Sequence, residues 1–325
     1  GQDVTQEHLL KINNLLNPET ASLTLFYDPM QAIYDNGRDI EALLLKTGFN
    51  IENTKQLVRQ QRSVQMITAL TYYEAVIRPD EPLDRIVKGV VEVSERYFLG
   101  YDNPVSAIAS GMARHLTEAG IQDVTKRLIK EAHNYCFLKQ FGTPKKVFID
   151  FIHIIRAKVD AGEAKYNDFL IIYPQRYIHT AYRSMPIVSS MKNTLNEYQI
   201  PFRIIDKGKG QDQGCSANFP DFELVEEFDN RDSTDLNENC VKAMTVHSAK
   251  GLDAEYVAIL GFENIGKYAE DEDDSEEITH SEKSASLGYV ALTRATKETH
   301  VYFIFRNQTV EVLEAVLNEF SYSKS

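Results

Sequence analysis

Apolar residues along this chain recur in two patterns: short continuous runs, and stripes in which they lie three and four positions apart. Continuous runs are typical of strands that are buried on both faces, and residues 168–173 are the clearest case. Stripes are typical of amphipathic helices. The sequence therefore predicts strands at 22–27, 168–173, 201–205, 243–246, 256–260 and 300–305, and helices at 8–16, 52–75, 147–157, 187–198 and 310–320.

The order of these elements predicts the fold class. Strands that alternate with helices indicate βαβ units, so we expect an α/β fold around a mostly parallel sheet. Residues 83–141 have helical spacing throughout, with glycines at the expected helix ends, and they predict an all-α insertion at about 83–145. Residues 207–239 are rich in Gly, Asp and Asn and predict a loop.

Composition narrows the class of protein. The chain has 325 residues, enough for about two domains, and 43 % apolar with 26 % charged residues is typical of a soluble globular protein. No apolar run approaches the roughly 20 residues that cross a bilayer, so no membrane partner is expected. The three cysteines have neither disulfide nor zinc spacing, which predicts a cytoplasmic protein without a Cys/His metal site.

The net charge of −13 argues against general polyanion binding, because phosphate contacts need Lys and Arg. Much of the acidic excess lies in residues 270–277, a run that is typical of a solvated loop. The remainder is only mildly acidic, so the charge is compatible with a local basic groove.

Two short blocks near the C-terminus, Thr245–Asp253 and Tyr289–Ala295, each hold a cation beside small residues, as a phosphate site would. Each block follows or ends in a β-rich apolar run, and ligands bind α/β sheets where strands end. Gly251 permits close backbone approach. Taken singly, each block has a simpler explanation: a basic turn in the first, and a helix-surface pairing of Arg294 with Glu298 in the second.

Together the two blocks closely resemble motifs V and VI of the UvrD/Rep/PcrA-like superfamily 1 DNA helicases. The resemblance implies that the first block contacts both DNA and nucleotide. Its implied DNA-binding residues are Thr245, His247 and Lys250, and its implied ATP-binding residues are Gly251 and Asp253. Asp253 stands where the family usually has Glu, so its side chain is shorter than the one that approaches the ribose in the family.

The same resemblance makes Arg294 a catalytic arginine that binds the γ-phosphate of ATP. Phosphoryl transfer develops charge on the γ-phosphoryl oxygens, and a guanidinium placed there stabilises that charge. An arginine of this kind accelerates the reaction roughly 10³–10⁵-fold.

Weaker matches precede these blocks. Residues 26–34 are similar to motif III, in which Gln31 would sense the γ-phosphate and Tyr34 would lie beside the DNA. Residues 57–63 resemble motif IV, in which Arg62 would be a second catalytic arginine that binds ATP. Three family positions are changed, those occupied here by Tyr27, Asn36 and Gln61, which predicts weaker stacking on bases and on adenine.

The resemblance implies a RecA-like fold in two parts. Residues 1–50 would be the tail of a first RecA-like domain, and residues 51–325 would be a second RecA-like domain interrupted by the helical insertion. ATP and Mg²⁺ would lie between the two domains, and DNA would lie across the opposite edge. The family moves along single-stranded DNA in the 3′-to-5′ direction, and the same polarity is implied here.

The sequence lacks G-x-x-x-x-G-K-[ST], the loop that holds the ATP phosphates. Gly1–Asp3 matches the tail of motif II, whose Asp-Glu pair for Mg²⁺ would precede Gly1. We therefore expect the C-terminal part of a longer helicase that is inactive without the missing N-terminal motor domain. The alternative is a non-catalytic DNA- or protein-binding module, or one subunit of a split motor.

Overall fold

The computed structural model describes residues 6–16, 23, 40–49, 65–90, 135–174, 177–179, 184–205, 239–265 and 280–322. These ranges contain both of the blocks near the C-terminus. The candidate residues Gln31, Tyr34 and Arg62 lie outside the described ranges, as do most of the predicted insertion and the predicted loop at 207–239.

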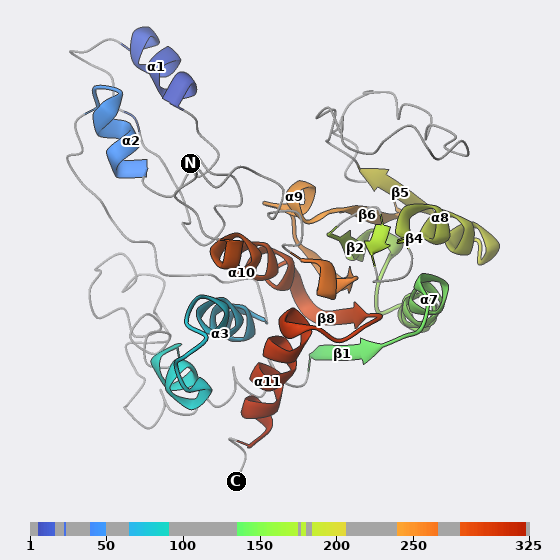
Figure 1. The fold of residues 1–325 in the computed structure, drawn as a ribbon. Helices are drawn as coiled ribbons and strands as arrows, with labels where there is room; N and C mark the ends of the chain where they lie inside the picture. The colour runs from blue at the N-terminus through green and yellow to red at the C-terminus, as the bar shows by residue number, and fades with distance from the viewer. Residues whose placement is uncertain are drawn as a thin grey trace, which may run out of the picture.

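A parallel sheet of six strands forms the centre of the fold (Figure 1). Its strands lie in the order β1-β8-β7-β2-β6-β5, and every pairing is parallel. The strands are β1 (Cys136–Gln140), β2 (Phe169–Tyr173), β5 (Phe202–Ile205), β6 (Val241–Thr245), β7 (Ala254–Leu260) and β8 (Ala295–Phe303). The α/β fold class predicted from the sequence is confirmed. A separate antiparallel pair is formed by β3 (Tyr177–His179) and β4 (Ser184–Pro186).

Helices cover both faces of the sheet, which explains why its strands read as continuous apolar runs (Figure 1). On β2, Ile171 and Ile172 are both buried but belong to two different hydrophobic clusters, one on each face. One face is covered by α7 (Pro144–Asp160) and α8 (Ile187–Glu197), and the other by α3 (Met66–Ile77), α10 (His280–Leu292) and α11 (Gln308–Tyr322).

Three further helices are α1 (Gln6–Leu15), α2 (Ile40–Lys46) and the short α9 (Val246–Ala249), and residues 83–90 are also helical. Asn13 of α1 donates from Nδ2 to the carbonyl oxygen of Thr47 at 3.1 Å, which joins α1 to the end of α2. Two 3₁₀ turns, Tyr166–Asp168 and Phe262–Asn264, precede β2 and follow β7.

The predicted all-α insertion is wrong at its C-terminal end. Cys136–Gln140 is β1, which pairs in parallel with Thr299–Phe303 of β8 at the edge of the sheet. The next helix, α7, begins at Pro144, with Thr143 as its N-cap. The run Cys-Phe-Leu-Lys is too short for its pattern to distinguish a helix from a strand. It forms a strand because β8 offers main-chain groups with which it can pair.

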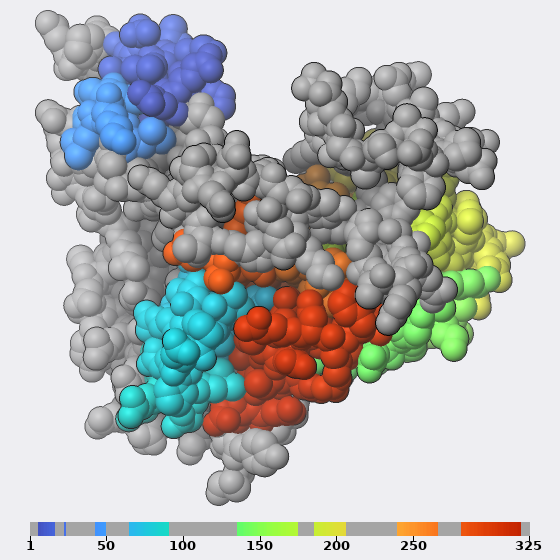
Figure 2. Space-filling model, in the orientation of Figure 1, coloured from blue at the N-terminus to red at the C-terminus, as the bar shows by residue number. Residues whose placement is uncertain are grey.

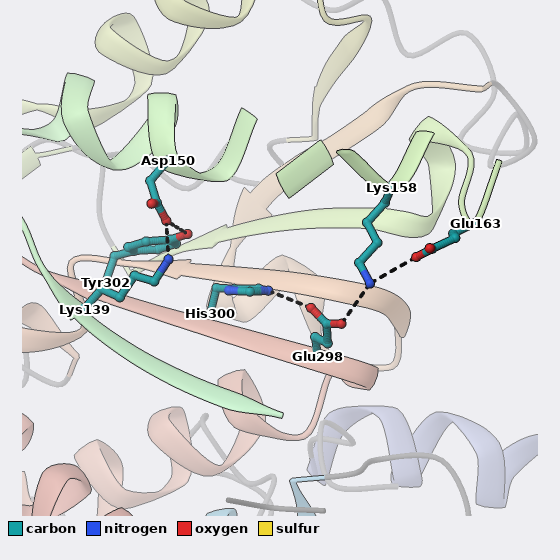
Figure 3. Close-up of polar contacts among 7 residues, drawn as sticks. All are labelled: Lys139, Asp150, Lys158, Glu163, Glu298, His300 and Tyr302. Atoms are coloured by element: carbon teal, nitrogen blue, oxygen red, sulfur yellow. Dashed lines mark hydrogen bonds and ion pairs between the residues drawn. The ribbon is translucent and has the colours of Figure 1, made fainter. Parts of the chain in front are cut away.

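A polar network joins β8 to the helix layer on the α7 side (Figure 3). The Glu298 carboxylate lies 3.2 Å from Nε2 of His300 and 3.2 Å from Nζ of Lys158, which comes from α7. The hydrogen bond with His300 and the charge of Lys158 hold the pKa of Glu298 below its ordinary value, against the opposing effect of burial. Glu298 is therefore ionised at neutral pH and ties β8 to α7.

A second group lies further along the same strand (Figure 3). The Tyr302 hydroxyl donates to Oδ2 of Asp150 at 2.8 Å, and Lys139 of β1 places Nζ 2.8 Å from the same oxygen. Burial and the Asp150 carboxylate both raise the pKa of Tyr302, so its hydroxyl stays protonated and remains a donor. Asp150 thus connects α7 to two neighbouring strands.

On the opposite face, α10 packs closely on α3, and residues 65–90 lie directly against residues 280–322 (Figure 2). Gly288 of α10 permits this approach, because a Cβ at its position would lie 2.2 Å from the Tyr72 ring. That ring is fully buried and packs edge-on against Phe262 with 5.5 Å between centroids, so it has no room to move aside.

Replacing Gly288 with Ala is expected to lower the free energy of unfolding by about 1–3 kcal/mol through overpacking. Urea unfolding of the purified chain measures this. The control is Gly89→Ala at an exposed helical position where a Cβ meets nothing within 4 Å. That change should leave stability unchanged or raise it by up to about 1 kcal/mol, because Ala is the better helix former. Equal effects at the two glycines would contradict this account of the α3–α10 contact.

Replacing Glu298 with Gln is expected to cost about 1–2 kcal/mol of unfolding free energy at neutral pH, where the lost partner is charged. Because the folded-state pKa of Glu298 is lowered, its contribution is complete above the ordinary value of about 4.5 and disappears as the pH falls through the folded-state pKa. The difference in unfolding free energy between the two proteins, taken from unfolding curves at each pH, should therefore be constant above about pH 5, and it should vanish only when the pH is taken below the folded-state pKa. Glu314→Gln, which removes an exposed partner of Arg306, is the control and should cost less than about 1 kcal/mol.

Candidate functional site

The segment Thr245–Asp253 connects β6 to β7, two strands that flank β2. Thr245 ends β6 level with Tyr173, the last residue of β2, whereas Asp253 immediately precedes the start of β7. Because all three strands are parallel, the segment leaves the carboxyl edge of the sheet and arrives at its amino edge. Its two ends therefore present residues at opposite edges.

At the carboxyl edge, Thr245 turns the chain into α9. Its Oγ1 accepts the main-chain N–H of Ser248 at 3.3 Å and donates to the Ser248 hydroxyl oxygen at 3.1 Å. This is an N-cap, which supplies an acceptor for a helical N–H that has no partner within the helix. The cap determines the direction of α9 and so the position of His247 on it.

His247 lies partly buried on α9 among positive charges. Burial first, and then the charges of Lys283 and Lys250, lower the pKa of His247 below its ordinary value of 6.5. The imidazole is therefore neutral at physiological pH. We refer to His247, Lys250 and Lys283 as the basic cluster.

Lys283 is a member of the basic cluster that the sequence does not indicate. It belongs to the first turn of α10, outside both blocks, and α10 packs against α9 in the fold. The chain has a net charge of −13, yet these three side chains that can carry positive charge gather at one place. No sequence spacing predicts this, because Lys283 joins the other two only through the contact between the two helices.

At the amino edge, Gly251 turns the chain toward β7 with φ +82°, in the region that favours glycine. Gly251 and Asp253 are both exposed, and a Cβ at Gly251 would meet nothing within 4 Å. The main-chain N–H of Ala254 then donates to the carbonyl oxygen of Arg294 at 3.0 Å, so the end of this segment lies beside the second block.

Arg294 lies in the turn between α10, which ends at Leu292, and β8, which begins at Ala295. Its side chain is buried, with 7 % exposed. Nε donates to the carbonyl oxygen of Val290 at 2.9 Å and Nη1 donates to that of Leu252 at 3.1 Å. The guanidinium therefore joins the end of α10 to the end of the first block.

One expectation about the second block and one simpler alternative to its proposed role are wrong. Tyr289–Leu292 is the last turn of a helix and not part of a β-rich run, because packing on α3 stabilises α10 through to Leu292. The pairing of Arg294 with Glu298 on a helix surface is also excluded. The helix ends before Arg294, and Glu298 lies on β8, where it contacts Lys158 and His300 instead.

The structure thus divides the described candidates into two groups. The carboxyl edge has Thr245 and His247, with Lys250 electrostatically coupled to His247, and the amino edge has Gly251, Asp253 and Arg294. Among the described residues, no group of three or more His, Cys, Asp or Glu could hold a metal ion. Within the same ranges, no helix is both long and apolar enough to cross a membrane.

Six parallel strands with helices on both faces define an α/β domain, with candidate residues at two opposite edges of its sheet. Residues 217–305 match the family model of the UvrD-like helicase C-terminal domain. This segment contains both blocks, so the resemblance to the UvrD-like helicases is confirmed there.

Among solved structures, the chain is similar to the C-terminal domain of a possible DNA helicase from Lactobacillus plantarum WCFS1, with 14 % sequence identity and a TM-score of 0.31. The alignment covers 56 % of this chain and 81 % of that one. No curated protein matches.

Proposed function

We propose that this chain is the C-terminal portion of an ATP-dependent superfamily 1 DNA helicase that translocates on single-stranded DNA in the 3′-to-5′ direction. One observation carries the proposal: a single segment, Thr245–Asp253, links a polar and basic surface at one edge of a sheet to a buried arginine at the other. A motor needs such a connection between its DNA track and its nucleotide site.

The carboxyl edge supports the DNA side of this proposal. DNA phosphates are bound by cations, hydroxyls and main-chain N–H groups, which position the strand without recognising sequence. Thr245, His247 and Lys250 provide donors of these kinds on one short segment. A phosphate oxygen bound at His247 would favour the protonated imidazole, so we expect the affinity for DNA to rise as the pH falls toward 6.

The amino edge supports the nucleotide side. Arg294 would stabilise charge on the γ-phosphate, and the open surface at Gly251 and Asp253 fits the approach of a nucleotide. Magnesium bound with ATP would neutralise charge on the phosphates. Among the described residues, no group of three or more His, Cys, Asp or Glu could hold a metal ion, and we expect the ligands of this Mg²⁺ to come mainly from elsewhere in the motor.

A non-catalytic binding module, or one subunit of a split motor, is the second candidate. It is favoured by the burial of Arg294, whose guanidinium bonds to carbonyl oxygens of its own domain. In a binding module, Arg294 would only connect α10 to the Thr245–Asp253 segment, and the carboxyl edge would still bind DNA. A binding module would therefore differ from the motor in ATP turnover and not in DNA binding, whereas a split-motor subunit would take part in turnover only with its partner.

We expect the purified chain to bind labelled single-stranded DNA with an affinity that falls as salt rises, as counterion release requires. Thr245→Ala and His247→Ala should each weaken binding about threefold to tenfold, because each removes a phosphate contact. Lys250→Ala should reduce by about one the slope of log affinity against log salt concentration, which we call the salt slope. Fluorescence anisotropy titrations at two or more salt concentrations measure these effects.

The control is Lys192→Ala, which removes the same charge from an exposed position on α8, a helix on the other face of the sheet. It should leave both the affinity and the salt slope unchanged. If Lys192→Ala and Lys250→Ala had equal effects, binding would be general charge attraction, and the carboxyl edge would not be the DNA track.

We expect no ATP hydrolysis by this chain alone, because a motor needs a phosphate-binding loop with its lysine, and none is present in the sequence. In the complete gene product, Arg294→Ala should lower kcat roughly 10³-fold, the lower limit for loss of an arginine finger, with little change in KM. A DNA-stimulated phosphate-release assay measures both. Turnover by the chain alone, abolished by Arg294→Ala, would show that the nucleotide site is complete within these residues.

A further inference from the structure

The hydroxyl of Thr293 occupies a central position in the contacts of Arg294. Thr293 is 6 % exposed. Its Oγ1 donates to the carbonyl oxygen of Tyr289 at 2.9 Å, lies 3.2 Å from that of Val290, and accepts Nη2 of Arg294 at 2.9 Å. One hydroxyl therefore connects the last turn of α10 to the guanidinium.

These contacts determine the plane of the guanidinium. Arginine has a long side chain with about 2 kcal/mol of rotamer entropy, and its planar fork of donors is oriented only when several nitrogens are held. Here Nε, Nη1 and Nη2 each donate to a different residue: Val290, Leu252 and Thr293. Of these three contacts, the one to Thr293 alone comes from a side chain, so a substitution can remove it without changing the main chain.

We propose that Thr293 is a positioning residue that holds the Arg294 guanidinium in one orientation at the amino edge of the sheet. The inference rests on the proposed function, in which Arg294 stabilises charge on the γ-phosphate. A donor that is already oriented needs no reorganisation when that charge develops, and misplacement by about 1 Å can cost about 10²-fold in rate. Thr293 itself would not touch the nucleotide.

A simpler role for Thr293 is local. Threonine hydroxyls near helix ends often bond the carbonyl oxygen four residues earlier, as Thr293 does with Tyr289, and this requires no partner on Arg294. Loss of that bond would change stability but would not act through the arginine. The test must therefore separate a loss of stability from an effect that depends on Arg294.

The experiment compares Thr293→Val, Thr293→Ser, Arg294→Ala and the double variant Thr293→Val with Arg294→Ala, all in the complete gene product. The readout is kcat and KM for DNA-stimulated ATP hydrolysis, with the melting temperature of each variant measured alongside. Valine keeps the shape but removes the hydroxyl, whereas serine keeps the hydroxyl. We expect Thr293→Val to lower kcat about tenfold with KM within about twofold, and Thr293→Ser to stay within about twofold of the unchanged protein.

The double variant decides how Thr293 acts. If Thr293 works through the guanidinium, adding Thr293→Val to Arg294→Ala should cause no further loss of kcat. An equal tenfold loss in both backgrounds would assign the effect to folding and overturn the inference. A rise in kcat with Thr293→Val would also overturn it, because the hydroxyl would then be holding the guanidinium away from the nucleotide.

The same set of variants separates failure of this inference from failure of the proposed function. If Arg294→Ala abolishes turnover and Thr293→Val does not change it, Arg294 is catalytic and Thr293 does not position it. If Arg294→Ala has the kcat of the unchanged protein, or if the complete gene product has no turnover, the catalytic role of Arg294 is wrong and the positioning role falls with it.

Discussion

The pairing of β2 with both β6 and β7 is the constraint on which the candidate site depends. Ile171 is opposite Ala243 on one neighbour and Ala258 on the other, and all three side chains are buried. Because β6 and β7 lie on either side of β2 and run parallel to it, the segment between them must cross from one edge of the sheet to the other. A shift of this pairing would move Thr245 and Arg294 relative to each other. The distance between the two halves of the site is thus determined by main-chain hydrogen bonds in the core.

The amino edge shows how a charged side chain can be buried in this core. The Arg294 guanidinium donates hydrogen bonds to two carbonyl oxygens and one hydroxyl. A buried guanidinium needs such acceptors because it has lost its contacts with water. The same bonds join α10 to the end of the Thr245–Asp253 segment. On the strand that follows Arg294, Glu298 pairs with Lys158 of α7, and Tyr302 donates to Asp150 of the same helix. Three hydrogen bonds therefore hold the arginine against its own domain.

Parts of this fold that contain long apolar runs could be predicted from the sequence, and parts that depend on packing could not. The central strands β2 and β7 are apolar along most of their length, since both of their faces are buried, and the sequence predicts their positions. By contrast, α10 contains small residues such as Ser286 and Gly288, which give no apolar stripe. Gly288 permits close contact with Tyr72, and that contact exists only in the folded chain. The strand β1 could not be predicted because its pairing with β8 comes from a distant segment.

The sequence alone determined the fold class, the order of most strands and helices, and the two blocks that resemble helicase motifs, because these depend on residue type and local spacing. The tertiary structure alone decided which residues of those blocks lie together. It separated Thr245 from Arg294 by the direction of the strands, and it brought Lys283 to His247 through contact between two helices. It also placed the hydroxyl of Thr293 on the guanidinium next to it. Such relations arise from the turn of the chain and the packing of distant segments, which local spacing does not specify.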